Sequence, residues 1–212
     1  MPVRPSRSIA ELRHAAVAYL GEFTDRSGSF AFATYDQADV HAGPITAADV
    51  LMANLLGLNL GWRDVIPLFA DDGLPPAQLR RALDAALDEA RQLPDLEACD
   101  EAQVEMPALR RANELARETM FPGARRRAWT EVTVSKVLHR LARNVPLVDS
   151  RVKRFYATRY AGDVRTRLRA DLVRNRGWLE ELTPAYPVRG EPLPLTRAAD
   201  ILIWMDGRQQ PS

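Results

Sequence analysis

Residues 129–160 restrict the fold most, because two apolar segments of helical spacing flank a short turn there. Within each segment the apolar residues recur every three or four positions, which places them on one face of a helix. Asn144 and Pro146 end the first helix, since proline cannot continue the backbone hydrogen bonds. Asp149 then stands directly before the second helix, where its carboxylate can accept from free backbone N–H groups. The apolar positions are Val134, Val137, Leu138 and Leu141, followed by Val152, Phe155 and Tyr156.

The rest of the 212-residue chain shows the same pattern, which indicates an all-α fold. Alanine, leucine and arginine dominate, and aromatic residues make up only 7%, a balance that favours helices over strands. We expect a single domain of about eight or nine helices, with an extended piece at Phe30–Tyr35. The other helices are expected at 8–24, from 47, at 62–69, from 75, and at 107–120, 164–182 and 196–205.

Charge is distributed unevenly, although the net charge is only +1. Residues 1–120 hold 11 basic and 19 acidic side chains, whereas residues 121–180 hold 15 basic and 5 acidic ones. We therefore expect an acidic first lobe at about 1–120 and a basic second lobe at about 121–212. A stretch this basic, including Arg125–Arg127, favours an anionic partner, nucleic acid first. Pairing of the arginines with the acidic half of the same chain is an equally open alternative.

Several classes of protein are disfavoured by what the sequence lacks. No apolar run approaches the roughly 18–20 residues that span a bilayer, and the first residues do not resemble a signal peptide. We expect a cytoplasmic protein without membrane contact. Cys99 is the single cysteine, so neither an internal disulfide nor a cysteine-based metal cluster is expected. The glycine-rich phosphate loops, H-E-x-x-H and G-x-S-x-G are also missing, so we expect no metal and no cofactor.

Asp149 is the one residue whose surroundings suggest chemistry. A carboxylate held at a helix start stays ionised, and it can orient water or stabilise positive charge that develops on a sugar. The alternative is a helix cap that contributes about 1 kcal/mol of stability and nothing more. Basic residues around it are candidate phosphate or substrate contacts, namely Lys136, Arg140, Arg151, Lys153 and Arg154.

Four further roles stay open from spacing alone. Lys136 is a candidate nucleophile, but we favour an exposed phosphate-binding lysine. His139 is either an accessory acid or base, or a core histidine with its hydrogen bonds satisfied. Trp129 and Tyr156 are accessory candidates for stacking on a base, and core packing is the simpler interpretation of each.

The segment Pro146-Leu147-Val148-Asp149-Ser150-Arg151-Val152 follows the helix that carries Ser135-Lys136-Val137-Leu138-His139. It resembles the P-x-V-D-x-x-V segment of the helix–hairpin–helix DNA glycosylases. The resemblance implies a two-lobed, all-helical fold in which Asp149 matches the catalytic aspartate, and it implies DNA as partner. Segments 45–51 and 145–152 also resemble a bacterial family without an assigned activity.

The chain departs from the glycosylase pattern in the hairpin. That family carries a glycine-rich L-P-G-V-G-type loop, whereas residues 127–131 contain no glycine. Lys136 lies too far along to match the lysine that follows this loop in bifunctional members, and the four-cysteine iron–sulfur loop is missing. We expect a DNA-binding protein that cleaves an N-glycosidic bond with Asp149. The alternatives are a non-catalytic interaction protein on the same fold and an enzyme acting on a small anionic metabolite.

Overall fold

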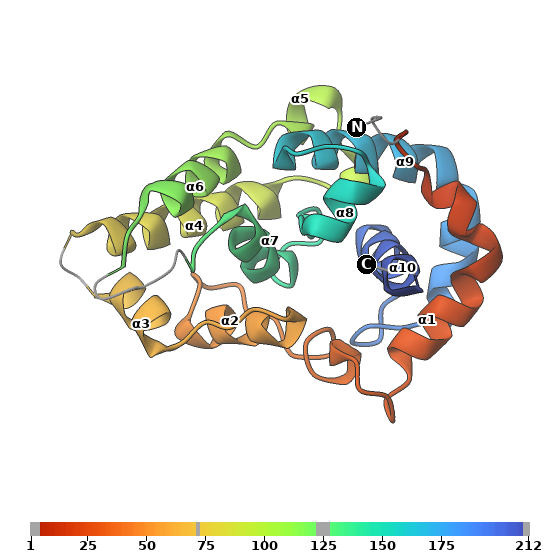
Figure 1. Ribbon diagram of the computed structural model, residues 1–212, viewed down its shortest axis with the longest axis horizontal. Coiled ribbons are helices and arrows are strands. Elements are labelled where there is room, and N and C mark those ends of the chain that lie inside the picture. Colours follow the sequence, from red (N-terminus) through yellow and green to blue (C-terminus); the bar gives the residue numbers. More distant parts are fainter. Residues whose placement is uncertain (1–4, 71–72, 122–127, 210–212) are drawn as a thin grey trace.

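The computed structural model describes residues 5–70, 73–121 and 128–209, and in these ranges it is all-α, as expected (Figure 1). The α-helices are α1 (Ala16–Thr24), α2 (Ala47–Met52), α3 (Trp62–Val65), α4 (Pro75–Gln92), α5 (Glu101–Val104), α6 (Pro107–Glu118), α7 (Glu131–His139), α8 (Ser150–Phe155), α9 (Ala161–Leu182) and α10 (Leu195–Gln209). Short 3-10 turns lie at η1 (Ile9–Ala15), η2 (Ala31–Ala33), η3 (Ala53–Leu56), η4 (Ile66–Phe69), η5 (Leu96–Ala98) and η6 (Thr183–Ala185). Among the described residues the pairing nearest to a sheet is an isolated bridge between Val188 and Glu191.

Local signals in the sequence set where the helices begin. Ser8 and Thr46 form capping boxes at η1 and α2, and each box satisfies two otherwise free N–H groups. Pro75 and Pro107 begin α4 and α6, where a missing N–H group costs nothing. The segment Phe30–Tyr35 differs from the expected extended piece, because it contains η2 and the backbone N–H of Tyr35 donates to Ala31.

Two groups of buried side chains form the core, and each defines a lobe. The α4 lobe is built from buried residues between Ile45 and Val145, although Leu96 belongs to the other core; α4 packs against α6, and α7 contacts both. The α10 lobe surrounds α10 with η1, α1, α8 and α9, as the right half of Figure 1 shows. Segments from both ends of the chain therefore share one core.

The division between the lobes differs from the expected boundary near residue 120. Helix α1 packs against α10 in the C-terminal core, because its apolar face covers one side of a helix that is buried nearly all round. Helix α7, expected in the basic lobe, contributes its apolar face to the α4 lobe instead. Charge along the chain therefore does not follow the division of the core.

The turn between α7 and α8 joins the two lobes. Val145 belongs to the core of the α4 lobe, whereas Val148 belongs to the core of the α10 lobe. Asp149 follows at once, so the residue singled out by the sequence lies at the junction of the two cores. No helix in the described ranges has the length and apolar character that a membrane crossing requires.

Candidate functional site

Asp149 is the N-cap of α8, as the sequence predicts. Its backbone is extended, and Oδ1 accepts hydrogen bonds from the N–H groups of Arg151 at 2.9 Å and Val152 at 3.1 Å. Only Oδ1 takes part in the cap, and Oδ2 accepts no hydrogen bond from the described part of the chain. Because a carboxylate has several acceptor positions, the capping role leaves Oδ2 available for other chemistry.

Asp149 lines a cavity of about 320 Å³ at the junction of the two lobes, which we call the Asp149 cavity. Both lobes contribute to it: α7 and the end of η3 come from one side, and α1, α8 and α10 from the other. Its volume falls within the roughly 300–1,000 Å³ typical of small-molecule sites. The lining consists of Phe23, Ser29, Phe30, Ala31, Leu55, Leu56, Gly57, Lys136, Leu147, Asp149, Val152, Arg197, Asp200, Ile201 and Trp204.

Lys136 lies inside this cavity, which corrects the expectation of an exposed lysine. Its side chain is buried, and Nζ donates a hydrogen bond to the carbonyl of Leu56 at 2.6 Å. Gly57, with a φ of 78°, turns the chain just after this carbonyl. Burial lowers the pKa of the Lys136 ammonium group, while the negative charge of Asp149 acts in the opposite direction. The lysine and the aspartate therefore line the same cavity, and the charge of the aspartate reaches the ammonium group.

Aromatic side chains form one wall of the Asp149 cavity. The rings of Phe23 and Phe30 stack with centroids 5.1 Å apart, and both meet the Trp204 ring edge to face, at 6.0 and 5.6 Å. The guanidinium of Arg151 lies 4.8 Å from the Trp204 ring and also donates to the Trp204 carbonyl. The guanidinium of Arg208 also lies over this wall, 4.9 Å from the centre of the Phe30 ring and 5.1 Å from that of the Trp204 ring.

A buried polar group from α10 lies beside this wall. Arg197 donates from Nε and Nη2 to the two carboxylate oxygens of Asp36, both at 2.7 Å. Asp200 is 1% exposed, and its Oδ2 accepts from the backbone N–H of Leu147 at 3.3 Å. Burial raises the pKa of the Asp200 carboxyl group well above its usual range, although Arg197 counteracts the effect. The site thus contains two carboxyl groups in different environments.

The other basic candidates are distributed differently. Arg140 binds the buried Asp49 and the carbonyl of Asp39, and Lys153 binds Glu131. Arg151 contacts Trp204, whereas Arg154 is exposed to solvent. Internal pairing with the acidic first part of the chain therefore accounts for Arg140. The segment Arg125–Arg127 lies outside the described residues.

The three accessory candidates are core residues. Trp129 is fully buried, donates to the carbonyl of Asp64 at 2.9 Å and stacks on Phe121. The Tyr156 hydroxyl donates to Asp171 inside the α10 lobe. His139 is buried against the carbonyl of Val145, and burial lowers its pKa to about 3. None of the three lines the Asp149 cavity in the described structure.

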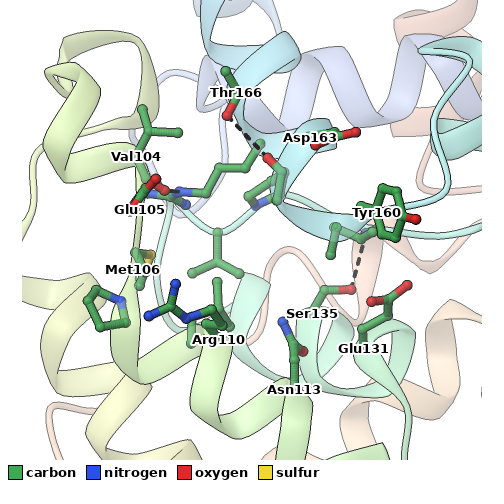
Figure 2. A pocket seen from close by; sticks show the side chains of 18 of the residues that line it. Val104, Glu105, Met106, Arg110, Asn113, Glu131, Ser135, Tyr160, Asp163 and Thr166 are labelled. Carbon is green, nitrogen blue, oxygen red and sulfur yellow. Dashed lines mark hydrogen bonds between the residues drawn. The ribbon is translucent and has the colours of Figure 1, made fainter.

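A second cavity of about 450 Å³ lies between α5, α6, α7 and α9, and we call it the Arg165 cavity (Figure 2). Figure 2 shows Glu105 and Arg110 on one side and Glu131 and Ser135 on the other. Arg165 is a buried residue of its lining that donates to the carbonyls of Val104 and Asn144, and burial lowers its pKa to about 10. The turn at 145–149 separates the two cavities, because Val145, Pro146 and Val148 line this one, and Leu147 and Asp149 line the other.

Sequence reasoning missed the contributions of the chain ends to the Asp149 cavity. Phe23 and Phe30 are far from Asp149 in sequence, and Arg197, Asp200 and Trp204 follow it by about 50 residues or more. One signal was present, because Arg197 and Asp200 interrupt the otherwise apolar helix at 195–205. Two charged residues one turn apart on a buried helix indicate either a paired network or a site. No group of three metal-binding side chains lies together among the described residues.

The fold and the cavity define an all-α, two-lobed protein with a carboxylate and a lysine at the junction of its lobes. The chain belongs to DUF6308, a family of unknown function, whose pattern matches residues 16–207. No curated protein and no solved structure matches the chain. The matched range includes every residue that lines the Asp149 cavity.

Proposed function

We propose that this protein hydrolyses the N-glycosidic bond of a nucleotide in DNA, with the extruded base held in the Asp149 cavity. One observation carries the proposal: Asp149, with Oδ2 unused by the helix cap, lines an aromatic-walled cavity together with the buried Lys136. The resemblance of residues 146–152 to the catalytic segment of helix–hairpin–helix glycosylases is consistent with it. An extruded base needs a pocket with an apolar lining, and Phe23, Phe30 and Trp204 contribute such a lining.

The chemistry assigned to Asp149 is electrostatic. As the bond between the sugar C1′ and the base nitrogen lengthens, positive charge develops on the sugar, and a nearby carboxylate stabilises it. Water then adds to C1′ and loses a proton, while the departing base keeps the bonding electron pair and gains a proton. Asp149 either stabilises the charged sugar or accepts the proton of the water. The negative charge of Asp149 acts on the Lys136 ammonium group, whose Nζ is a donor for a carbonyl or a phosphate oxygen.

Contacts with DNA phosphates fall to the exposed members of the basic segment. Arg154 on α8 and Arg143 just after α7 are solvent-exposed on either side of the turn that carries Asp149. Neither lines the Asp149 cavity, so as exposed arginines they are assigned to phosphates of the strand outside it. Of the five candidate contacts, Arg154 is at the surface and Arg151 lies beside Trp204. The other three are bound within the protein, namely Lys136, Arg140 and Lys153.

A second candidate is an enzyme that acts on a small anionic substrate, such as a free nucleotide. The observation in its favour is that Lys136, Arg140 and Lys153 are already engaged within the protein. This pairing reduces the number of basic groups available for a long polyanion. A small nucleotide would need only the Asp149 cavity and a single nearby arginine, such as Arg151 beside Trp204.

The test begins with binding of labelled single-stranded, duplex and abasic-analogue DNA over a range of salt concentrations. Tight, salt-sensitive binding that favours the abasic analogue supports action on DNA. Base release is then measured on duplexes with modified bases and on the corresponding free nucleotides. Release from free nucleotides alone supports the second candidate. If the protein shows no DNA binding and no base release, a non-catalytic protein is supported instead.

The matched pair of variants is Asp149→Asn and Asp100→Asn. Asp100 caps α5 through a hydrogen bond to the N–H of Gln103, but it does not line the Asp149 cavity. Asparagine caps helices about as well as aspartate, so both variants keep their folds. Asp149→Asn is expected to abolish base release and Asp100→Asn to preserve it. Equal activity of the two variants refutes the assignment.

A further inference from the structure

Lys136 and Lys153 are the two lysines of the chain, and the fold places them in opposite surroundings. Lys153 on α8 is half-buried, and its ammonium group pairs with the carboxylate of Glu131. Lys136 on α7 is 8% exposed and lines the Asp149 cavity, where Nζ donates to the carbonyl of Leu56 at 2.6 Å. Within the described part of the chain no carboxylate forms an ion pair with Lys136. One lysine therefore has a charged partner, and the other has only a neutral acceptor.

The charges around Lys136 come from two helices besides its own. Burial has the largest effect and lowers the pKa of the Lys136 ammonium group, because the charged form loses its hydration. From α8, Asp149 acts in the opposite direction, whereas Arg151 acts in the same direction as burial. From α10, Arg197 and Asp200 line the same cavity. The balance favours the free amine more than in an ordinary exposed lysine.

Loss of the proton leaves the contact of this nitrogen with Leu56 intact. The hydrogen bond to the Leu56 carbonyl uses one N–H group, so a neutral amine keeps it and still carries a free lone pair. Neutral lysine amines in desolvated cavities add to the carbonyl carbon of aldehydes and ketones. We propose that Lys136 forms an imine with a small uncharged aldehyde bound in the Asp149 cavity.

The step balances in atoms and charge. The lone pair of Nζ forms a bond to the aldehyde carbon, and one amine proton passes to the aldehyde oxygen. This oxygen takes up a further proton and leaves as water, so that a protonated imine with one N–H remains. The charge of Asp149, which acts on the ammonium group, acts in the same way on the positive imine.

The lining of the cavity selects the charge of the aldehyde. Leu55, Leu147 and Ile201 contribute apolar surface, and the carboxylate of Asp149 is negative. An anionic aldehyde would lose its hydration there and meet a like charge, whereas an uncharged one avoids both costs. The volume of about 320 Å³ is ample for a molecule of a few carbon atoms.

Reductive trapping tests the proposal on the intact protein. Propanal is added at neutral pH with cyanoborohydride, which delivers hydride to the imine carbon and fixes a propyl group on the nitrogen. Peptide mass mapping then locates this group on Lys136, Lys153 or the N-terminal amine. At limiting propanal we expect Lys136 to be modified while Lys153 stays unmodified. The rate at Lys136 is expected to saturate as the propanal concentration rises, because the cavity fills.

Three controls separate the cavity from ordinary amine reactivity. In urea the cavity is lost, so both lysines are expected to react at similar rates. Lys136→Arg keeps a cation and a donor but removes the nucleophile, and it is expected to lose the early modification, which Lys153→Arg retains. Glyoxylate, an anionic aldehyde, is expected to show a smaller preference for Lys136 than propanal shows.

The wild-type map alone can overturn the proposal, so the result does not depend on how a variant folds. Modification of Lys153 or of the N-terminal amine before Lys136 overturns it, and so does the absence of any trapped product. A rate at Lys136 that rises without saturation overturns it as well, because reaction then requires no bound aldehyde. Equal preference for glyoxylate and propanal contradicts the selection of an uncharged ligand. The assay contains no nucleotide, so its outcome is separate from that of the proposed function.

Discussion

Nε2 of His139 lies 3.6 Å from Oδ2 of Asp200, and both side chains are buried. The other ring nitrogen, Nδ1, must donate to the Val145 carbonyl, since a carbonyl oxygen only accepts. Because burial lowers the pKa of His139 to about 3, the ring is neutral near pH 7, and Nε2 presents a lone pair toward the carboxyl group. Burial also raises the pKa of Asp200, so the two form a neutral pair near pH 7. His139 ends α7, just before the turn that holds Asp149, and Asp200 lies on α10, which lines the Asp149 cavity.

The neutral pair predicts how stability depends on pH. The unfolded chain protonates His139 below about pH 6.5, whereas the folded protein does so only near 3, so acid destabilises the fold in this window. Asp200 acts in the opposite direction, because above about pH 3.9 the unfolded chain releases a proton that the folded protein retains. The two slopes partly cancel in the wild type.

Asp200→Asn removes one of these opposing slopes. Its free energy of unfolding is expected to rise with pH between about 4 and 6 by up to about 1.4 kcal/mol per pH unit, the slope of a single proton. The wild type is expected to change much less in the same range. Urea unfolding at several pH values measures both slopes, and His139→Gln serves as the reciprocal variant. Identical slopes in the wild type and Asp200→Asn contradict the neutral pair.

Asp149 is expected to separate the capping role from the catalytic role. Asp149→Ala removes the side chain that caps α8 and is expected to destabilise the protein by about 1 kcal/mol. Asp149→Asn preserves the cap and is expected to change stability by only a few tenths of a kcal/mol. Both variants lose base release if the carboxylate is catalytic. Chemical denaturation and the release assay together identify a residue that only caps, since Asp149→Asn would then remain active.

Substitution by alanine is expected to affect stability strongly at Arg140 and only slightly at Arg154. Arg140→Ala leaves the buried carboxylate of Asp49 without its guanidinium partner and is expected to cost about 3 kcal/mol of stability. Arg154→Ala changes an exposed side chain and is expected to alter stability by less than about 0.5 kcal/mol. The variant also loses about one phosphate contact, so the slope of the logarithm of the DNA-binding constant against the logarithm of the salt concentration is expected to fall by about one. An unchanged salt slope would remove Arg154 from the DNA interface.

The Asp36–Arg197 pair is expected to hold the loop after η2 against α10. Either Asp36→Asn or Arg197→Met alone leaves a buried charge without its partner, at an expected cost of about 3–5 kcal/mol. The double variant removes both charges and is expected to be more stable than the sum of the two single losses implies. Thermal or urea unfolding of all four proteins measures the coupling. Additive effects would show that the two residues act independently.

Most helices of this protein were predictable because their signals are local. Ser8 and Thr46 start their helices through hydrogen bonds to residues two or three positions away, and Asp149 does the same for α8. Such interactions do not depend on the rest of the fold. The 3-10 turn η2 was not predicted, because Ala31–Ala33 carries no cap and its position follows from packing of Phe32 in the α10 lobe.

The site was predictable only in part, because many of its contacts join residues that are far apart in sequence. Asp149 and its cap were found from neighbouring residues, whereas the burial of Lys136 depends on the carbonyl of Leu56, which lies 80 positions away in sequence. The expected phosphate contact of Arg140 was replaced by an ion pair with Asp49 for the same reason. A charged side chain takes the partner that the fold brings to it, and periodicity carries no information about that partner.

The sequence by itself therefore determined the helical class, most helix starts and the carboxylate at the head of α8, since each follows from residues within one or two turns. Only the tertiary structure decided that α1 and α10 share a core and that Phe30, Lys136, Asp149 and Asp200 line one cavity. The physical reason is that burial acts on whole helix faces. Each apolar face must be covered by another, but many arrangements satisfy that requirement, and the choice among them depends on how all the faces pack at once.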